Sequence, residues 1–139
     1  MSSPQASYTT EDEVMFYDTD IGGVVHNLAY LRMIERCRTL LAVGIGFDLA
    51  KMAENSVYPV LVRTEVDYKR PATLGETIRT EGHISQWGRA RFSCSFEMRR
   101  CGDEELLVVC RQDLAVVAMP GGRILRLDDP SLGLAQPCS

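Results

Sequence analysis

Apolar residues between positions 30 and 45 recur at steps of three and four, which is the period of an amphipathic helix. They are Tyr30, Leu31, Ile34, Cys37, Leu41 and Ile45. The pattern predicts one long helix of about four turns, ended by Gly44 and Gly46. The segment 47–55 predicts a second, short helix capped by Asp48.

After Ser56 the apolar period changes from helical to two, which predicts strands. The segments are 57–69, 76–87, 91–99 and 106–119. The fourth is apolar at nearly every position, as expected of a central strand that is buried on both faces. In the first of them, the residues expected to share one face are Val60, Val62, Val66 and Tyr68.

A short strand is also predicted ahead of the helix, over residues 13–17, with Val14 and Phe16 on one face. Residues 1–11 have no apolar period, and we expect a disordered leader there. Residues 12–130 then form a single domain and residues 131–139 a C-terminal tail. The element order predicts an α+β fold, in which an antiparallel sheet of about five strands wraps around the long central helix.

Composition narrows the function classes. The net charge of −4 and the absence of a basic stripe argue against nucleic-acid binding. No apolar run approaches the roughly 20 residues that span a bilayer, so no membrane insertion is expected. The five cysteines have no C-x-x-C spacing and the two histidines are isolated, so we expect a cytoplasmic protein without a metal site.

An acidic, glycine-containing segment immediately precedes the long helix. It reads Asp18-Thr19-Asp20-Ile21-Gly22-Gly23-Val24-Val25 and is followed by Tyr30-Leu31 and Glu35-Arg36. From about Glu13 to about Leu127 the chain resembles the hotdog-fold acyl-CoA thioesterases of the 4-hydroxybenzoyl-CoA thioesterase type. This resemblance implies the hotdog fold and a thioester hydrolase.

The resemblance makes Asp20 the catalytic carboxylate. It would either attack the thioester carbonyl or activate a water molecule that attacks instead, and both routes stay open. Asp18 is expected to organise the loop.

Other site residues follow from the same motif. The amides at Asn27 and Leu28, at the start of the helix, are the expected oxyanion donors, and Gly23 shapes the approach to them. His26 is a candidate for a direct part in catalysis or for a packing role, and Asn27 for orienting a water molecule or the substrate carbonyl. Glu35, farther along the helix, is a second candidate carboxylate or a member of an ion pair.

No cofactor is expected, because coenzyme A or phosphopantetheine enters as part of the substrate. Arg63, Arg89 and Arg91 are the cations expected to bind its phosphates. The substrate is carried by CoA or by an acyl-carrier protein, and its acyl group stays open between aromatic, aliphatic and polyketide. The resemblance implies a homodimer or homotetramer in which strand 57–69 completes the partner's pocket.

Two other functions remain on the same fold. One is a non-catalytic protein that binds acyl thioesters, since fold alone does not fix function. The other is a hydratase or dehydratase of acyl thioesters, which the D-x-D and Gly-Gly pattern disfavours.

Overall fold

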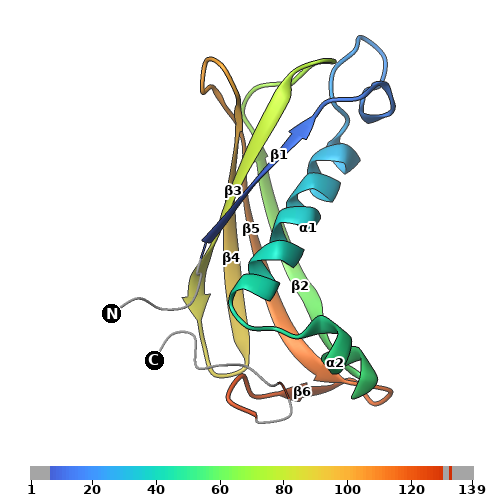
Figure 1. The fold of residues 1–139 in the computed structure, drawn as a ribbon, viewed down its shortest axis with the longest axis vertical. Helices are drawn as coiled ribbons and strands as arrows, with labels where there is room; N and C mark the ends of the chain where they lie inside the picture. The colour runs from blue at the N-terminus through green and yellow to red at the C-terminus, as the bar shows by residue number, and fades with distance from the viewer. Residues whose placement is uncertain (1–6, 130–131, 133–139) are drawn as a thin grey trace.

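The computed structural model describes residues 7–129 and residue 132, and within them one antiparallel sheet curls around a helix (Figure 1). The strands run in the order β1-β3-β4-β5-β2, and the short β6 pairs with β5. Their bounds are β1 Ser7–Glu13, β2 Val57–Tyr68, β3 Thr77–Trp87, β4 Arg91–Arg100, β5 Leu106–Ala118 and β6 Arg123–Leu125. The helical elements are η1 Phe16–Asp18, α1 Asn27–Gly44 and α2 Leu49–Glu54. The predicted fold class and the four strands after the helices are confirmed.

Helix α1 has 18 residues and ends at Gly44, as the glycine pattern predicted. At 1.5 Å per residue it is about 27 Å long, whereas the 13 residues of β5 span roughly 44 Å. The helix is therefore short beside the sheet that it packs on. Asp48 caps α2 as predicted, because its Oδ1 accepts a hydrogen bond from the Lys51 amide at 3.0 Å.

The predicted apolar face of α1 is the buried one. Buried residues of the helix are Ala29, Tyr30, Met33, Ile34, Cys37 and Leu41. Gly82 on β3 makes room for this face. A Cβ at Gly82 would lie 2.7 Å from Phe96 Cε1 and 3.1 Å from Cys37 Sγ, so a side chain there would push the sheet and helix apart.

The first strand begins earlier than predicted. Strand β1 covers Ser7–Glu13 and pairs with β3, so residues 7–11, which we expected in a disordered leader, belong to the sheet. Residues 1–6 of that leader lie outside the described residues. The predicted strand over 13–17 is wrong beyond Glu13, where β1 ends, because Phe16 opens a 3-10 turn and is 80% exposed. Of the expected C-terminal tail, the structure describes Leu132, which is buried.

The predicted face of β2 is wrong in its first half. A register shift between Leu61 and Arg63 places Leu61 opposite the buried Leu114, while Val66 lies opposite Cys110. Residues on either side of such a bulge exchange faces. Leu61 is therefore on the helix side with Val66, and Val60 is not. Strand β2 is also an edge strand, and most of its side chains are exposed.

Within the described residues, no helix is both long enough and apolar enough to cross a membrane.

Candidate active site

The acidic segment forms a tight turn between η1 and α1. The Asp20 amide donates to the Val24 carbonyl and the Gly23 amide to the Asp20 carbonyl, both at 3.0 Å. Gly22 and Gly23 have φ values of +91° and +74°, which L-residues with a side chain rarely adopt. No atom lies within 4 Å of a Cβ built on either glycine. The glycines are therefore required for the backbone conformation of the turn, which leaves Asp20 exposed at its start.

Asp18 stabilises this turn through hydrogen bonds of its buried side chain. Its side chain is 2% exposed, and its Oδ2 accepts a hydrogen bond from the Met15 amide at 3.0 Å. Its Oδ1 accepts from Arg32 Nη2 on α1 at 2.8 Å, and its carbonyl accepts from the His26 amide. The two carboxylates of the motif therefore lie in different environments: Asp18 ties the loop to the helix, and Asp20 faces solvent.

His26 is the N-cap of α1. Its Nδ1 accepts a hydrogen bond from the Ala29 amide at 3.1 Å. Its Nε2 lies 3.2 Å from the Tyr17 carbonyl, which can only accept, so Nε2 carries the proton. The one lone pair of the neutral ring is therefore engaged at the helix start, and in this arrangement it is not available to a substrate water molecule.

The first amides of α1 lie immediately beyond this cap. Among the described residues, neither the Asn27 nor the Leu28 amide has a hydrogen-bond acceptor, as expected for the first turn of a helix. The Gly23 amide, in contrast, is used inside the turn. The two free donors point outward at the positive end of the helix dipole, a position that favours a developing negative charge.

Leu28 and Glu35 both line one cleft, about 300 Å³ in volume, between α1 and the edge strand β2. Its other lining residues are Leu31, Arg32, Arg38, Leu61, Thr64 and Gln112. The Glu35 side chain is 66% exposed, and its Oε2 accepts from Arg38 Nη2 at 3.4 Å. Asp20 does not line this cleft; it lies in the turn before the first residues of the helix.

The predicted phosphate-binding arginines do not line the cleft between α1 and β2. Arg63 lies on β2 and forms an ion pair with Glu65 at 2.6 Å. Arg89 and Arg91 lie at the β3–β4 connection, near the opposite end of the sheet from the acidic turn (Figure 1). Within one chain Arg89 and Arg91 therefore lie far from Asp20, because β3 carries their turn a whole strand length away, and their binding of the CoA phosphates stays a prediction.

A hollow that sequence analysis did not single out lies nearer the turn. Its volume is about 230 Å³, and it is lined by Val25, Tyr30, Tyr68, Lys69, Arg70 and Pro71. Burial raises the pKa of Tyr30, whose hydroxyl oxygen accepts a hydrogen bond from the Ala72 amide at 2.9 Å. Lys69 and Arg70 are exposed at its rim, so this hollow offers cations and an aromatic ring beside the end of the acidic segment. The signal in the sequence was the K-R pair that follows the last aromatic residue of β2.

No group of three or more histidine, cysteine, aspartate or glutamate side chains is placed to hold a metal ion in residues 7–129 or at residue 132. Burial raises the pKa of Cys94 to about 12 and that of Cys110 to about 11. These two thiols therefore stay protonated and act as core residues.

An antiparallel sheet curled around one central helix is the hotdog fold. Two solved structures superpose on this chain. A 1,4-dihydroxy-2-naphthoyl-CoA thioesterase from Synechocystis gives a TM-score of 0.80 at 24% identity, over 89% of this chain and 91% of that one. A Staphylococcus aureus protein in complex with CoA gives 0.83 at 13% identity, over 95% and 81%. Both likenesses show the fold.

The family follows from the sequence match. Residues 14–132 match the family model of the thioesterase-like superfamily, and the chain belongs to this family. It is 30% identical over 104 residues to the acyl-CoA thioester hydrolase YbgC of Escherichia coli, covering 70% of this chain and 76% of the relative. It is 27% identical over 95 residues to a 1,4-dihydroxy-2-naphthoyl-CoA hydrolase of Synechococcus elongatus, covering 67% and 70%. The predicted resemblance is confirmed.

Proposed function

We propose that this protein hydrolyses an acyl-CoA thioester to a free acid and CoA, with Asp20 as the reacting carboxylate. The observation that carries the proposal is the exposed Asp20 in a glycine turn, directly ahead of a helix whose first two amides have no acceptor among the described residues. The names of the relatives, acyl-CoA thioester hydrolase and 1,4-dihydroxy-2-naphthoyl-CoA hydrolase, support the same reaction.

Two routes fit this arrangement. In the first, an Asp20 oxygen attacks the thioester carbonyl carbon, the C–S bond breaks, and CoA leaves as a thiolate that takes a proton from solvent. Water then hydrolyses the mixed anhydride and regenerates Asp20. In the second, Asp20 takes a proton from a water molecule, whose oxygen attacks the same carbon; the C–S bond then breaks, and Asp20 returns the proton to the leaving CoA thiolate. In both, the Asn27 and Leu28 amides stabilise the oxyanion, and one such donor contributes about 2.7–4 kcal/mol.

The CoA phosphates fit best over Lys69 and Arg70, with Tyr68 available for stacking against the nucleotide. This hollow includes Val25, which ends the acidic segment, so a pantetheine arm could run from it to the turn. A second hollow, about 430 Å³ in volume, includes Arg91 and lies on the outer face of the sheet. It would bind CoA only if a second protomer brought this hollow beside the Asp20 turn.

A homodimer, or a tetramer built from it, is part of the proposal. Val60, Leu61 and Val62 are exposed on the edge strand β2, and an exposed apolar edge strand favours pairing with another strand. Pairing of β2 with its copy would also place the partner against the cleft between α1 and β2. Light scattering of the native protein against Val62→Lys tests this, since a charge on the edge should shift the mass toward that of the monomer.

The activity is tested by thiol release over benzoyl-, hydroxybenzoyl-, short-chain and long-chain acyl-CoAs, for the native protein and Asp20→Asn. We expect turnover by the native protein and a loss of about a hundred- to ten-thousandfold in Asp20→Asn with acyl-CoA binding retained. Binding without turnover in both proteins would favour the thioester-binding alternative. Glu35→Gln serves as the comparison carboxylate and should retain most of the activity.

Two further assays separate the remaining alternatives. Loss of the enoyl-CoA chromophore without thiol release would indicate the hydratase or dehydratase reaction. Hydrolysis of acyl-carrier-protein thioesters but not of acyl-CoA would show that the substrate is bound to the carrier protein. The proposed role of Asp20 would not change.

A further inference from the structure

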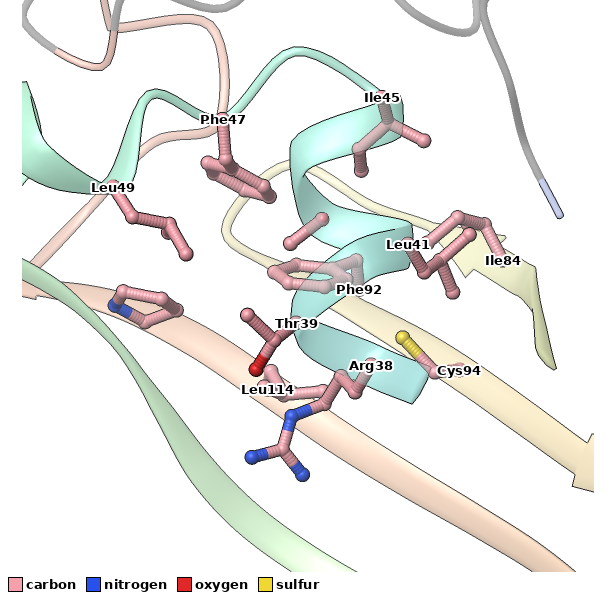
Figure 2. A pocket seen from close by; sticks show the side chains of 12 residues that line it. Arg38, Thr39, Leu41, Ile45, Phe47, Leu49, Ile84, Phe92, Cys94 and Leu114 are labelled. Carbon is pink, nitrogen blue, oxygen red and sulfur yellow. The ribbon is translucent and has the colours of Figure 1, made fainter. Parts of the chain in front are cut away.

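Arg38 lies on the buried side of α1, at the junction of two cavities. One is the cleft between α1 and β2, and the other is a smaller pocket under the last turns of the helix. Figure 2 shows this second pocket, with Phe47, Phe92 and Leu114 around it and the Arg38 guanidinium at its edge. The Arg38 side chain is only 17% exposed, so its charge is largely withdrawn from water.

The partners of this guanidinium are one buried neutral amide and one distant, solvent-exposed carboxylate. Its Nη1 donates to Oε1 of Gln112, which is a neutral amide. Its Nη2 reaches Oε2 of Glu35 at 3.4 Å, a long contact to a side chain that is mostly in solvent. A guanidinium has five N–H donors, so donors remain that have no acceptor among the described residues.

Gln112 fixes the orientation of this group. It is buried on β5, and its Nε2 donates to Thr64 Oγ1 on β2 at 3.4 Å. The amide therefore turns its oxygen toward Arg38. This makes Gln112 a positioning residue that holds the guanidinium between the helix and the sheet, facing the cleft.

The size of the pocket beyond Arg38 limits which part of an acyl chain can enter it. Its volume is about 90 Å³, and apart from Arg38 and Thr39 its lining is apolar, from Leu41 and Ile45 to Phe92. A cavity that binds benzene has about 150 Å³. A short aliphatic end therefore suits this pocket better than a ring does.

We propose that Arg38 is a specificity-determining residue that binds an acceptor oxygen on an aliphatic acyl chain, whose short apolar end enters the pocket behind it. The oxygen belongs to an oxo or hydroxyl group within the chain, or to a terminal carboxylate, in which case no apolar end enters the pocket. A largely buried positive charge, whose only anionic partner among the described residues is the mostly exposed Glu35 at 3.4 Å, favours such a group, because hydrogen bonds to charged groups are the stronger ones. The inference rests on the proposed thioesterase function and names the substrate class for the same site.

The test compares four eight-carbon substrates, namely octanoyl-, hydroxyoctanoyl-, oxooctanoyl- and suberoyl-CoA. Thiol release is measured for the native protein, Arg38→Met and Arg36→Met. Arg36 is the matched control, because it lies on the same helix and pairs with Asp12 on the outside at 3.3 Å. We expect Arg38→Met to lower kcat/KM by about ten- to a hundredfold for acceptor-bearing chains, and to leave octanoyl-CoA within about threefold. The three acceptor substrates distinguish the source of the oxygen.

A second variant covers a failure of Arg38→Met to fold. Gln112→Glu supplies an internal carboxylate to Arg38 while keeping the side chain's shape, so the preference for acceptor-bearing chains should disappear with Arg38 still present. An equal loss for all four substrates in Arg38→Met, or a native protein that does not prefer acceptors, would overturn the proposal.

Absence of thiol release from any substrate by the native protein would count against the proposed function, and calorimetric binding of the same four compounds then decides the role of Arg38. Tighter binding of acceptor-bearing chains by the native protein than by Arg38→Met supports that role. Equal binding refutes it.

Discussion

Replacing Asp18 by alanine should unfold the protein at a lower temperature, although the proposed reacting carboxylate is Asp20 and not Asp18. The substitution removes the acceptor of the Met15 amide at 3.0 Å and the ion pair with Arg32 at 2.8 Å. A hydrogen bond to a charged group contributes about 1.5–3 kcal/mol. The Arg32 side chain is half exposed, so the ion pair adds at most about 1 kcal/mol. The expected loss is about 3 kcal/mol, or a fall of roughly 10 °C in Tm for a chain of this length.

Asp20→Ala is the matched control. Asp20 is exposed and its side chain has no hydrogen bond or ion pair among the described residues, so the free energy of unfolding should stay within about 0.5 kcal/mol of native. Thermal unfolding and thiol release are measured on both variants. Asp18→Ala should lose stability and part of its activity, and Asp20→Ala only activity. A Tm of Asp18→Ala within about 2 °C of native would refute the structural role assigned to this buried carboxylate.

Three further predictions concern the cap, the core and the buried thiols. His26→Ala should cost about 0.5–2 kcal/mol of stability by removing the N-cap. His26→Asn can still cap the helix and should keep both stability and turnover. A stable but inactive His26→Asn would instead indicate that His26 takes part in catalysis. Gly82→Ala should destabilise by about 1–3 kcal/mol in thermal melts because of the contact with Phe96, and Phe96→Leu in the same chain should recover part of it; an unchanged melt of the single variant would contradict the packing. Burial raises the pKa of Cys94 to about 12 from 9.0 and that of Cys110 to about 11, so their stabilising effect is complete below pH 9 and is lost as pH rises from 9 toward 12. Urea unfolding in that range should show the decline, and Cys94→Ala should flatten it; an equal slope in both proteins would contradict the assignment.

Helix α1 could be predicted from the sequence because its apolar face is formed by residues that are three or four positions apart. Steps of three and four bring side chains onto one face of any helix, whatever the rest of the chain does, and five of the six stripe residues are indeed buried. Leu31 is the exception. It lines the cleft toward β2 and is half-buried, because the sheet contacts the helix mainly through β1 and β3.

Strand β1 could not be predicted in the same way. Its sequence, SYTTEDE, carries no apolar alternation, since an edge strand can be held by backbone hydrogen bonds to its neighbour. Pairing with β3, some 70 residues later in the chain, makes it a strand. The face of β2 was mispredicted for a related reason: the bulge at Leu61 follows from how β2 pairs with β5, and a shift of one residue exchanges the faces.

The candidate site likewise has one part that the sequence predicted and one part that it did not. The acidic motif and its glycines could be recognised from adjacent residues, because positive φ values and a helix start are local properties. The turn and the first amides of the helix lie where the motif placed them, whereas the role of His26 as the N-cap was not foreseen. Arg38 was not foreseen, since a charged residue on a helix is usually solvated. Its partial burial depends on Gln112 and Thr64, which are brought beside it by β5 and β2.

Local chemistry in the chain was thus enough to specify the helices, the later strands and the acidic turn, because each depends on neighbours a few residues away. Pairing across the sheet settled what no local pattern contains: that Ser7 belongs to a strand, that Leu61 faces the helix, and that Arg89 and Arg91 lie far from Asp20. These outcomes depend on pairing between strands that are far apart in the sequence. A pattern of neighbouring residues therefore does not predict them.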